Sequence, residues 1–149
     1  MTTALATNYR YIGTTDETAT CEHCGKTNLR STVVLSMLDN DGNHQEFVRY
    51  GSTCAAHTLG ERSGAHVRKL ARNAHWKTLQ DAAEARRMLD HYGIPASGTI
   101  TTDMLVKAGC KYATNHPNIC TSYDATIEAV MDMVARHRKT LREAAMIGA

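Results

Sequence analysis

Two short runs of strand-forming residues flank a polar turn in the first third of the chain. Residues 32–38 (TVVLSML) and 45–50 (QEFVRY) are rich in β-branched, aromatic and aliphatic side chains. Residues 39–43 (DNDGN) carry the Asp, Asn and Gly that favour a tight turn. The pattern therefore predicts a β-hairpin over residues 32–50.

Beyond the hairpin, apolar residues recur at helical spacing. A short helix is expected to begin with Ser52 as its N-cap and to end at Gly60. A longer helix is expected from Ser63 to about His91, where the GIP sequence at 93–95 stops it. Its apolar positions, many of them alanine, suit close packing between helices: Val67, Leu70, Ala71, Ala74, Ala82, Ala85 and Leu89.

Two further helices complete the pattern. Thr101 or Thr102 is expected to cap the first, and Gly109 to bend or end it. The second is expected from residues 121–124 to about Met146, with the 115–118 segment (NHPN) as a break before it. The apolar positions assigned to the core are Met104, Leu105 and Ala108 in the first helix and Ile127, Val130, Met131, Val134 and Leu141 in the second.

These elements predict an α+β fold in which a β-hairpin and a short helix pack on a mostly α-helical C-terminal part. We divide the chain into residues 1–60 and residues 61–149 and expect one compact domain. A chain of 149 residues with 42% hydrophobic content can bury about 70% of its surface, which supports a sizeable core.

Four residues of the first third have the spacing of zinc ligands. Cys21 and Cys24 form a CxxC pair followed by glycine, and Cys54 and His57 form a second pair about thirty positions later. Zinc prefers four nitrogen or sulfur ligands in a tetrahedron, and pairs at this spacing converge on one ion. We therefore expect a structural Zn²⁺ site, because four protein ligands leave no open position for a catalytic water.

Several residues compete with His57 for the place of the fourth ligand. His23 lies inside the first pair, and His44 lies near the tip of the predicted hairpin. Cys110 and Cys120 lie far along the chain. We interpret them either as core thiols or as a second ligand pair with His116. His57 is the preferred fourth ligand because its spacing from Cys54 repeats that of a helical turn.

The order of a cysteine knuckle, a hairpin and a ligand-bearing helix over residues ~18–60 resembles a treble-clef zinc finger. The CxxCG start, with Cys21 and Cys24, and the GxxCxxH finish, with Cys54 and His57, carry this resemblance. Residues 12–16 (IGTTD), 24–29 (CGKTNL) and 51–55 (GSTCA) also look like small actinobacterial and phage proteins that lack an assigned activity.

Charge is distributed unevenly along the chain, although the net charge is only +2. The segment from 62 to 77 contains five basic residues and no acidic one, and Trp76 lies within it. Such a helix can follow the phosphates of DNA or RNA, and Trp76 can either stack on a base or pack in the core. The residues assigned to nucleic-acid binding are Arg62, Arg68, Lys69, Arg72 and Lys77; the alternative for them is a solvated helix face.

Two other classes of function remain open at this stage. A phage or mobile-element factor of this size can bind a host protein such as RNA polymerase. Treble-clef geometry also occurs in His-Asn-His nucleases, but His44 follows an Asp-Gly turn and the helix residues are committed to zinc. No phosphate-binding glycine loop, paired-carboxylate motif or nucleophile elbow is recognisable. We therefore assign no catalytic residues.

The location is expected to be the cytoplasm. Residues 1–8 (MTTALATN) lack a basic start followed by an apolar stretch, and the chain has five cysteines, an odd number. Both features favour a reducing compartment over disulfide formation. No stretch approaches the roughly 20 apolar residues of a membrane span, so no membrane partner is expected.

Overall fold

A computed structural model describes residues 8–149 of the chain. Residues 1–7, most of the segment inspected for an export signal, lie outside the described residues. The described chain forms two compact units. Unit 1 comprises the residues up to Leu79 together with Glu143–Ala149, and unit 2 comprises Gln80–Arg142. The dividing point lies inside a long helix, whereas the division drawn from the sequence lies at residue 60.

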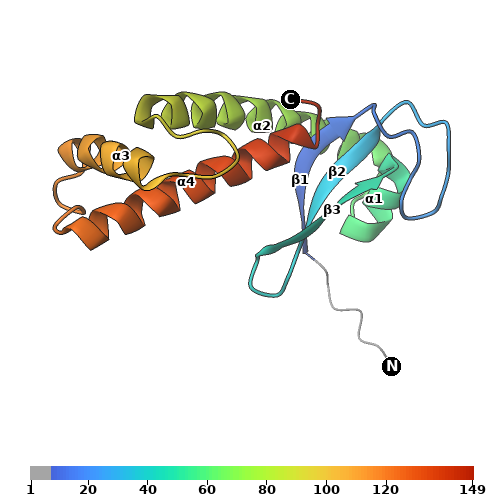
Figure 1. Ribbon diagram of the computed structural model, residues 1–149. Coiled ribbons are helices and arrows are strands. Elements are labelled where there is room, and N and C mark those ends of the chain that lie inside the picture. The colour runs from blue at the N-terminus through green and yellow to red at the C-terminus, as the bar shows by residue number, and fades with distance from the viewer. Residues whose placement is uncertain (1–7) are drawn as a thin grey trace. The chain divides into compact units, whose positions relative to one another are not determined.

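Unit 1 is built on a three-stranded antiparallel sheet, with β2 at its centre (Figure 1). The strands are β1 (Asn8–Thr15), β2 (Thr32–Leu38) and β3 (His44–Tyr50). The predicted hairpin is confirmed, since Val33 pairs with Tyr50 and Leu35 with Val48. Strand β1 was not expected, and its pairing with β2 shifts register between Tyr11 and Gly13.

Both faces of β2 are buried. Val33 and Leu35 belong to a core cluster with the short helix α1 (Ser52–Leu59) and the beginning of α2 (Gly64–Tyr92). Val34 points to the opposite face, where it clusters with Ile12 and Ile147. This alternation follows from the period of two along a strand. The central strand therefore has an apolar partner on each side, which explains its almost uninterrupted run of hydrophobic residues.

The helix ends in unit 1 follow the expected chemistry with one exception. Gly60 takes a left-handed φ of 69° after α1, and the Ser63 hydroxyl accepts a hydrogen bond from the His66 amide at 3.1 Å. Ser52 is not the N-cap of α1; Gly51 occupies that position without a side-chain bond. The Ser52 hydroxyl instead accepts a hydrogen bond from Arg68 at 2.9 Å, which joins α1 to α2.

The bulge in β1 fixes α2 against the sheet. The Thr78 hydroxyl donates to the Ile12 carbonyl at 2.7 Å, and the Thr14 amide donates to His75 Nδ1 at 3.3 Å. Gly13 lies between these bonds, where a Cβ would stand only 2.8 Å from His75 Nδ1 and 3.0 Å from an Ile147 methyl. The missing side chain at Gly13 is therefore what allows α2 to approach the strand.

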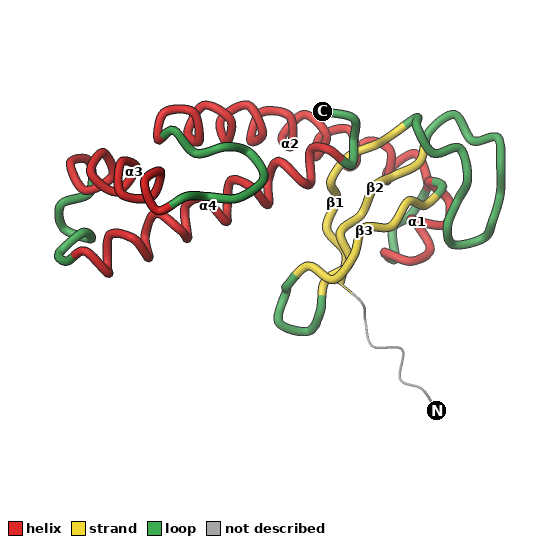
Figure 2. Tube along the Cα trace, viewed as in Figure 1, coloured by secondary structure: helices red, strands yellow, loops and turns green. Residues whose placement is uncertain are grey.

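Unit 2 is helical and contains the second half of α2, α3 (Thr102–Asn115) and most of α4 (Tyr123–Ala145), drawn in red in Figure 2. These helices contribute to one core. Thr101 caps α3 through a hydrogen bond from Met104, and α2 ends at Gly93 with a φ of 68°. Gly109 does not end α3, which continues to Asn115. The core cluster contains Leu89, Tyr92, Ile94, Ala108, Tyr112, Val130, Met133 and Val134.

One apolar position of α4 was assigned wrongly from the sequence. Met131 is 55% exposed, whereas Met133 is 2% exposed and occupies the core. The buried stripe of α4 runs through Val130 and Val134, and Met131 lies at the edge of that stripe. Arg138, one of the basic residues near the end of α4, donates to the carbonyls of Pro95 and Gly98. That side chain therefore orders the loop before α3.

None of the helices among residues 8–149 combines the length and the apolar character that crossing a membrane requires.

Candidate metal centre

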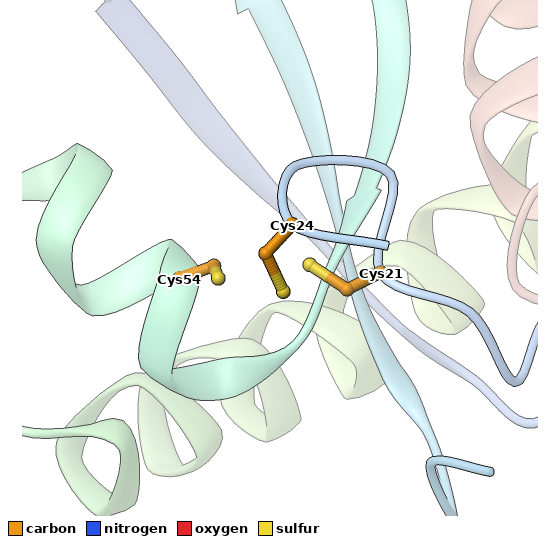
Figure 3. A group of neighbouring side chains, drawn as sticks. All are labelled: Cys21, Cys24 and Cys54. Atoms are coloured by element: carbon orange, nitrogen blue, oxygen red, sulfur yellow. The ribbon is translucent and has the colours of Figure 1, made fainter. Parts of the chain in front are cut away.

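Cys21 and Cys24 lie on a tight turn that follows β1. The Gly25 amide donates to the Cys21 carbonyl at 2.8 Å, and the Cys21 amide donates to the Lys26 carbonyl at 2.9 Å. Gly25 has a φ of 77°, a left-handed conformation that suits glycine and lets the turn close. The turn holds both thiols on its inner side (Figure 3).

The turn is fastened to the end of β3. The Glu22 amide donates to the Arg49 carbonyl at 2.9 Å. In return the Arg49 amide donates to the Glu22 carboxylate at 2.8 Å, and the two side chains form an ion pair at 3.3 Å. Because Arg49 lies two residues before Gly51, these bonds place the turn beside the start of α1.

Cys54 comes from the first turn of α1. Strand β3 ends at Tyr50, Gly51 follows it, and α1 begins at the next residue. A Cβ at Gly51 would lie 3.9 Å from the Cys21 sulfur, so the helix start runs close to the knuckle. The N-terminus of a helix carries partial positive charge, which favours a thiolate in its first turn, but at Cys54 the neighbouring Cys24 thiol outweighs this effect and raises the pKa.

The three sulfur atoms of Cys21, Cys24 and Cys54 all lie within 4.8 Å of one another, and they point toward a common centre (Figure 3). None of the three thiols is in a disulfide. Thiolates around a tetrahedral ion with metal–sulfur bonds of about 2.3 Å stand roughly 3.8 Å apart. Side-chain rotations that move the sulfur atoms by about an ångström would therefore bring this cluster to metal-binding geometry. The three cysteines could hold a metal ion.

The three thiols of the cluster influence one another's protonation. Burial alone would raise the pKa of Cys21, but the backbone amides of Gly51, Cys24 and His23 point to its sulfur and lower its pKa to about 7. The neighbouring Cys24 thiol, burial and Cys21 raise the pKa of Cys54 to about 12. One thiolate thus forms readily and the last one only with difficulty. The positive charge of a bound metal ion would offset the repulsion among the thiolates, and the remaining thiol protons would then be released.

His57 is not part of this cluster. It lies one helical turn after Cys54 on α1, but its side chain is exposed, and the group of mutually close ligand atoms consists of the three cysteines. His57 as fourth ligand therefore stays a prediction. His23, a competitor for that place, is exposed and packs its ring against Tyr50 with centroids 5.3 Å apart.

The more distant candidates have other surroundings. Cys110 is exposed on α3, and Cys120 is half-buried against the core of unit 2. His116 stacks on the Tyr112 ring, with centroids 4.1 Å apart, and donates from Nδ1 to the Tyr112 carbonyl at 3.1 Å. Within the part of the chain that the structure describes, these three residues form no metal-binding group.

His44 is engaged within the hairpin. It is the first residue of β3, its Nδ1 lies 2.6 Å from the Ser36 hydroxyl, and its ring packs on Phe47 with centroids 4.3 Å apart. Both contacts position the imidazole against its own strands.

The basic residues assigned to nucleic-acid binding are all exposed. The Glu61 carboxylate lies 3.3 Å from His66 Nε2, and among residues 8–149 no carboxylate pairs with Arg62, Arg68, Lys69 or Arg72. Lys77, by contrast, has an interaction partner. Trp76 is 65% exposed, so of the two roles left open for it the core role is excluded.

No protein-family model, curated protein or solved structure matches this chain at a significant level.

Proposed function

We propose that this protein is a non-catalytic zinc-binding module that binds nucleic acid through the exposed basic face of α2. The cluster of Cys21, Cys24 and Cys54 carries the metal half of the proposal. Lys69 and Arg72, which are exposed on α2 and have no partner carboxylate among residues 8–149, support the other half. In this account the metal fixes unit 1, and α2, which packs on the same sheet, presents the binding surface.

Zinc is the metal that suits these ligands best. Three thiolates form a soft donor set, which selects zinc, Cu(I) or an iron–sulfur cluster over hard cations such as magnesium. The order of knuckle, hairpin and ligand-bearing helix is also that of a treble-clef finger, and Cys54 enters from the first turn of α1 as that arrangement requires. Free thiols at such a site need a reducing compartment, which supports a cytoplasmic location.

We propose His57 as the fourth ligand, because residues three apart on a helix share a face and Cys54 already points into the cluster. Replacing His57 with alanine is expected to weaken zinc affinity by about 10- to 100-fold, measured by competition with a chromophoric chelator. His91→Ala is the matched control, since it removes an exposed imidazole of α2 that is not a candidate ligand. Equal affinities for the two variants would move the fourth ligand to another residue or to water.

The orientation of α2 supports phosphate binding. Val67, Ala71 and Thr78 are buried against the sheet, so the residues on the opposite side of the helix face solvent. Lys69 and Arg72 lie on that side, one helical turn apart, without a partner carboxylate among residues 8–149. Basic side chains of this kind exchange their counterions for phosphate oxygens. Arg68 is less suited to a test, because its bond to Ser52 gives it a structural role.

A salt series with DNA and RNA tests this interface. The double variant Lys69→Ala/Arg72→Ala is expected to lose at least about tenfold in affinity at 50 mM salt, and to reduce the slope of log K against log salt by about 2. Arg136→Ala/Lys139→Ala, which removes two exposed cations from α4, is expected to leave both values unchanged. Absence of binding to either nucleic acid at low salt would reject the proposal and favour a protein partner.

A further inference from the structure

Trp76 is exposed on α2, and its side chain contributes little to the packing of the fold. It is the only tryptophan of the chain, and 65% of it is accessible to solvent. Among residues 8–149 its ring has no aromatic neighbour and its indole nitrogen has no hydrogen-bond partner. Because tryptophan is among the side chains that gain most from burial, an indole left in water contributes little to folding.

The residues one and two turns before Trp76 on its side of α2 are polar or basic. Arg72 and Asn73 precede it by four and three residues, and Lys69 by seven, so all three share its side of the helix. All three are exposed. With a rise of 1.5 Å per residue, Arg72 lies about 6 Å and Lys69 about 10 Å along the helix axis from Trp76. A flat apolar ring thus stands at the end of a row of cations.

This combination of groups suits an unpaired nucleotide chain better than a duplex. A base has an exposed aromatic face only when it is unstacked, whereas the bases of a duplex present edges in the grooves. Sites for single strands combine cations that follow the phosphates with aromatic rings on which bases stack. For a surface that bound only duplex phosphates, an exposed indole would add nothing.

We propose that Trp76 stacks on an unpaired base while Arg72 and Lys69 contact successive phosphates, which makes single-stranded nucleic acid the ligand of the α2 surface. This inference rests on the proposed nucleic-acid binding and narrows its ligand class. The shared chemistry is a base with its flanking phosphates, so both single-stranded DNA and single-stranded RNA qualify, and Asn73 is placed to hydrogen-bond the base or the sugar.

The test compares the wild type with Trp76→Ala in binding to dT15, U15 and a 15-base-pair duplex, each measured at the same salt concentration. The intrinsic fluorescence of the single tryptophan is expected to be quenched by dT15 or U15. Trp76→Ala is expected to weaken binding of the preferred single strand by at least about tenfold and to change duplex affinity less than twofold. Trp76→Phe, which keeps an aromatic face, is expected to recover most of the loss.

Tyr123 provides a matched control, because it is an aromatic residue with the same 65% exposure in unit 2. Tyr123→Ala is expected to leave every affinity unchanged. If Trp76→Ala binds single strands as tightly as the wild type while Lys69→Ala/Arg72→Ala still loses affinity, the stacking inference is wrong and the proposed function stands. If no nucleic acid binds at low salt, both fail, and the exposed indole is then better explained as the anchor of a protein contact.

Discussion

Replacing Cys24 with serine is expected to abolish metal retention and to lower the free energy of unfolding of the protein by more than about 3 kcal/mol. Metal binding at a cysteine site contributes directly to folding, because the site does not exist in the unfolded chain. Cys24 is the informative position of the three, since its side chain is exposed and serine leaves no cavity there. Zinc content by elemental analysis and denaturant unfolding measure the two effects.

Cys110→Ser is the matched control for this variant. Cys110 is also an exposed, unbridged cysteine, but it lies on α3, outside the cluster. The substitution is expected to retain the full metal content and to change stability by less than about 0.5 kcal/mol. A Cys24→Ser protein as stable and as rich in metal as Cys110→Ser would show that Cys24 is not a ligand.

Gly13→Ala is expected to destabilise the protein by about 1–3 kcal/mol. The φ of Gly13 does not lie in the left-handed region, so alanine fits the backbone conformation, and on that ground alone the substitution would be slightly stabilising. The added methyl group, however, would lie 2.8 Å from His75 Nδ1 and 3.1 Å from the His75 Cα. Urea unfolding of the metal-loaded protein measures the effect.

A double-mutant cycle with His75→Ala assigns this effect to its cause. Removing the imidazole eliminates the closest of the contacts, while the Cα of residue 75 and the Ile147 methyl remain. The cost of Gly13→Ala is therefore expected to be smaller, but not zero, in the His75→Ala background. An identical cost in both backgrounds would mean that the His75 imidazole is not the source of the destabilisation.

Local signals in the sequence were sufficient for most helix ends and for the hairpin. Ser63, Thr101 and Gly60 have the side chains, or the lack of one, that capping requires, and each acts as expected. Strand β1 was missed because Gly13 interrupts it, although Tyr9 and Tyr11 alternate with polar residues in the manner of a strand. Pairing with β2 and contact with α2 stabilise β1, and both are tertiary effects.

The three cysteines of the candidate site could be found from spacing alone, because CxxC geometry is local and Cys54 follows a strand and a glycine. The fourth ligand could not be assigned from spacing, since several residues compete for the place and His57 is exposed in the structure. Ser52 was misassigned because Arg68, sixteen residues away, engages its hydroxyl. The exposure of Trp76 likewise depends on which side of α2 meets the sheet, and that is set by Gly13, His75 and Thr78.

Native mass spectrometry of the full chain, purified without an affinity tag and without added chelator, tests the central claim most directly. We expect a folded protein whose mass exceeds that of the polypeptide by one zinc ion. Chelation is expected to remove that ion and, with it, the compact charge-state distribution. A chain that is folded and metal-free, and that stays so when zinc is supplied, would contradict the claim.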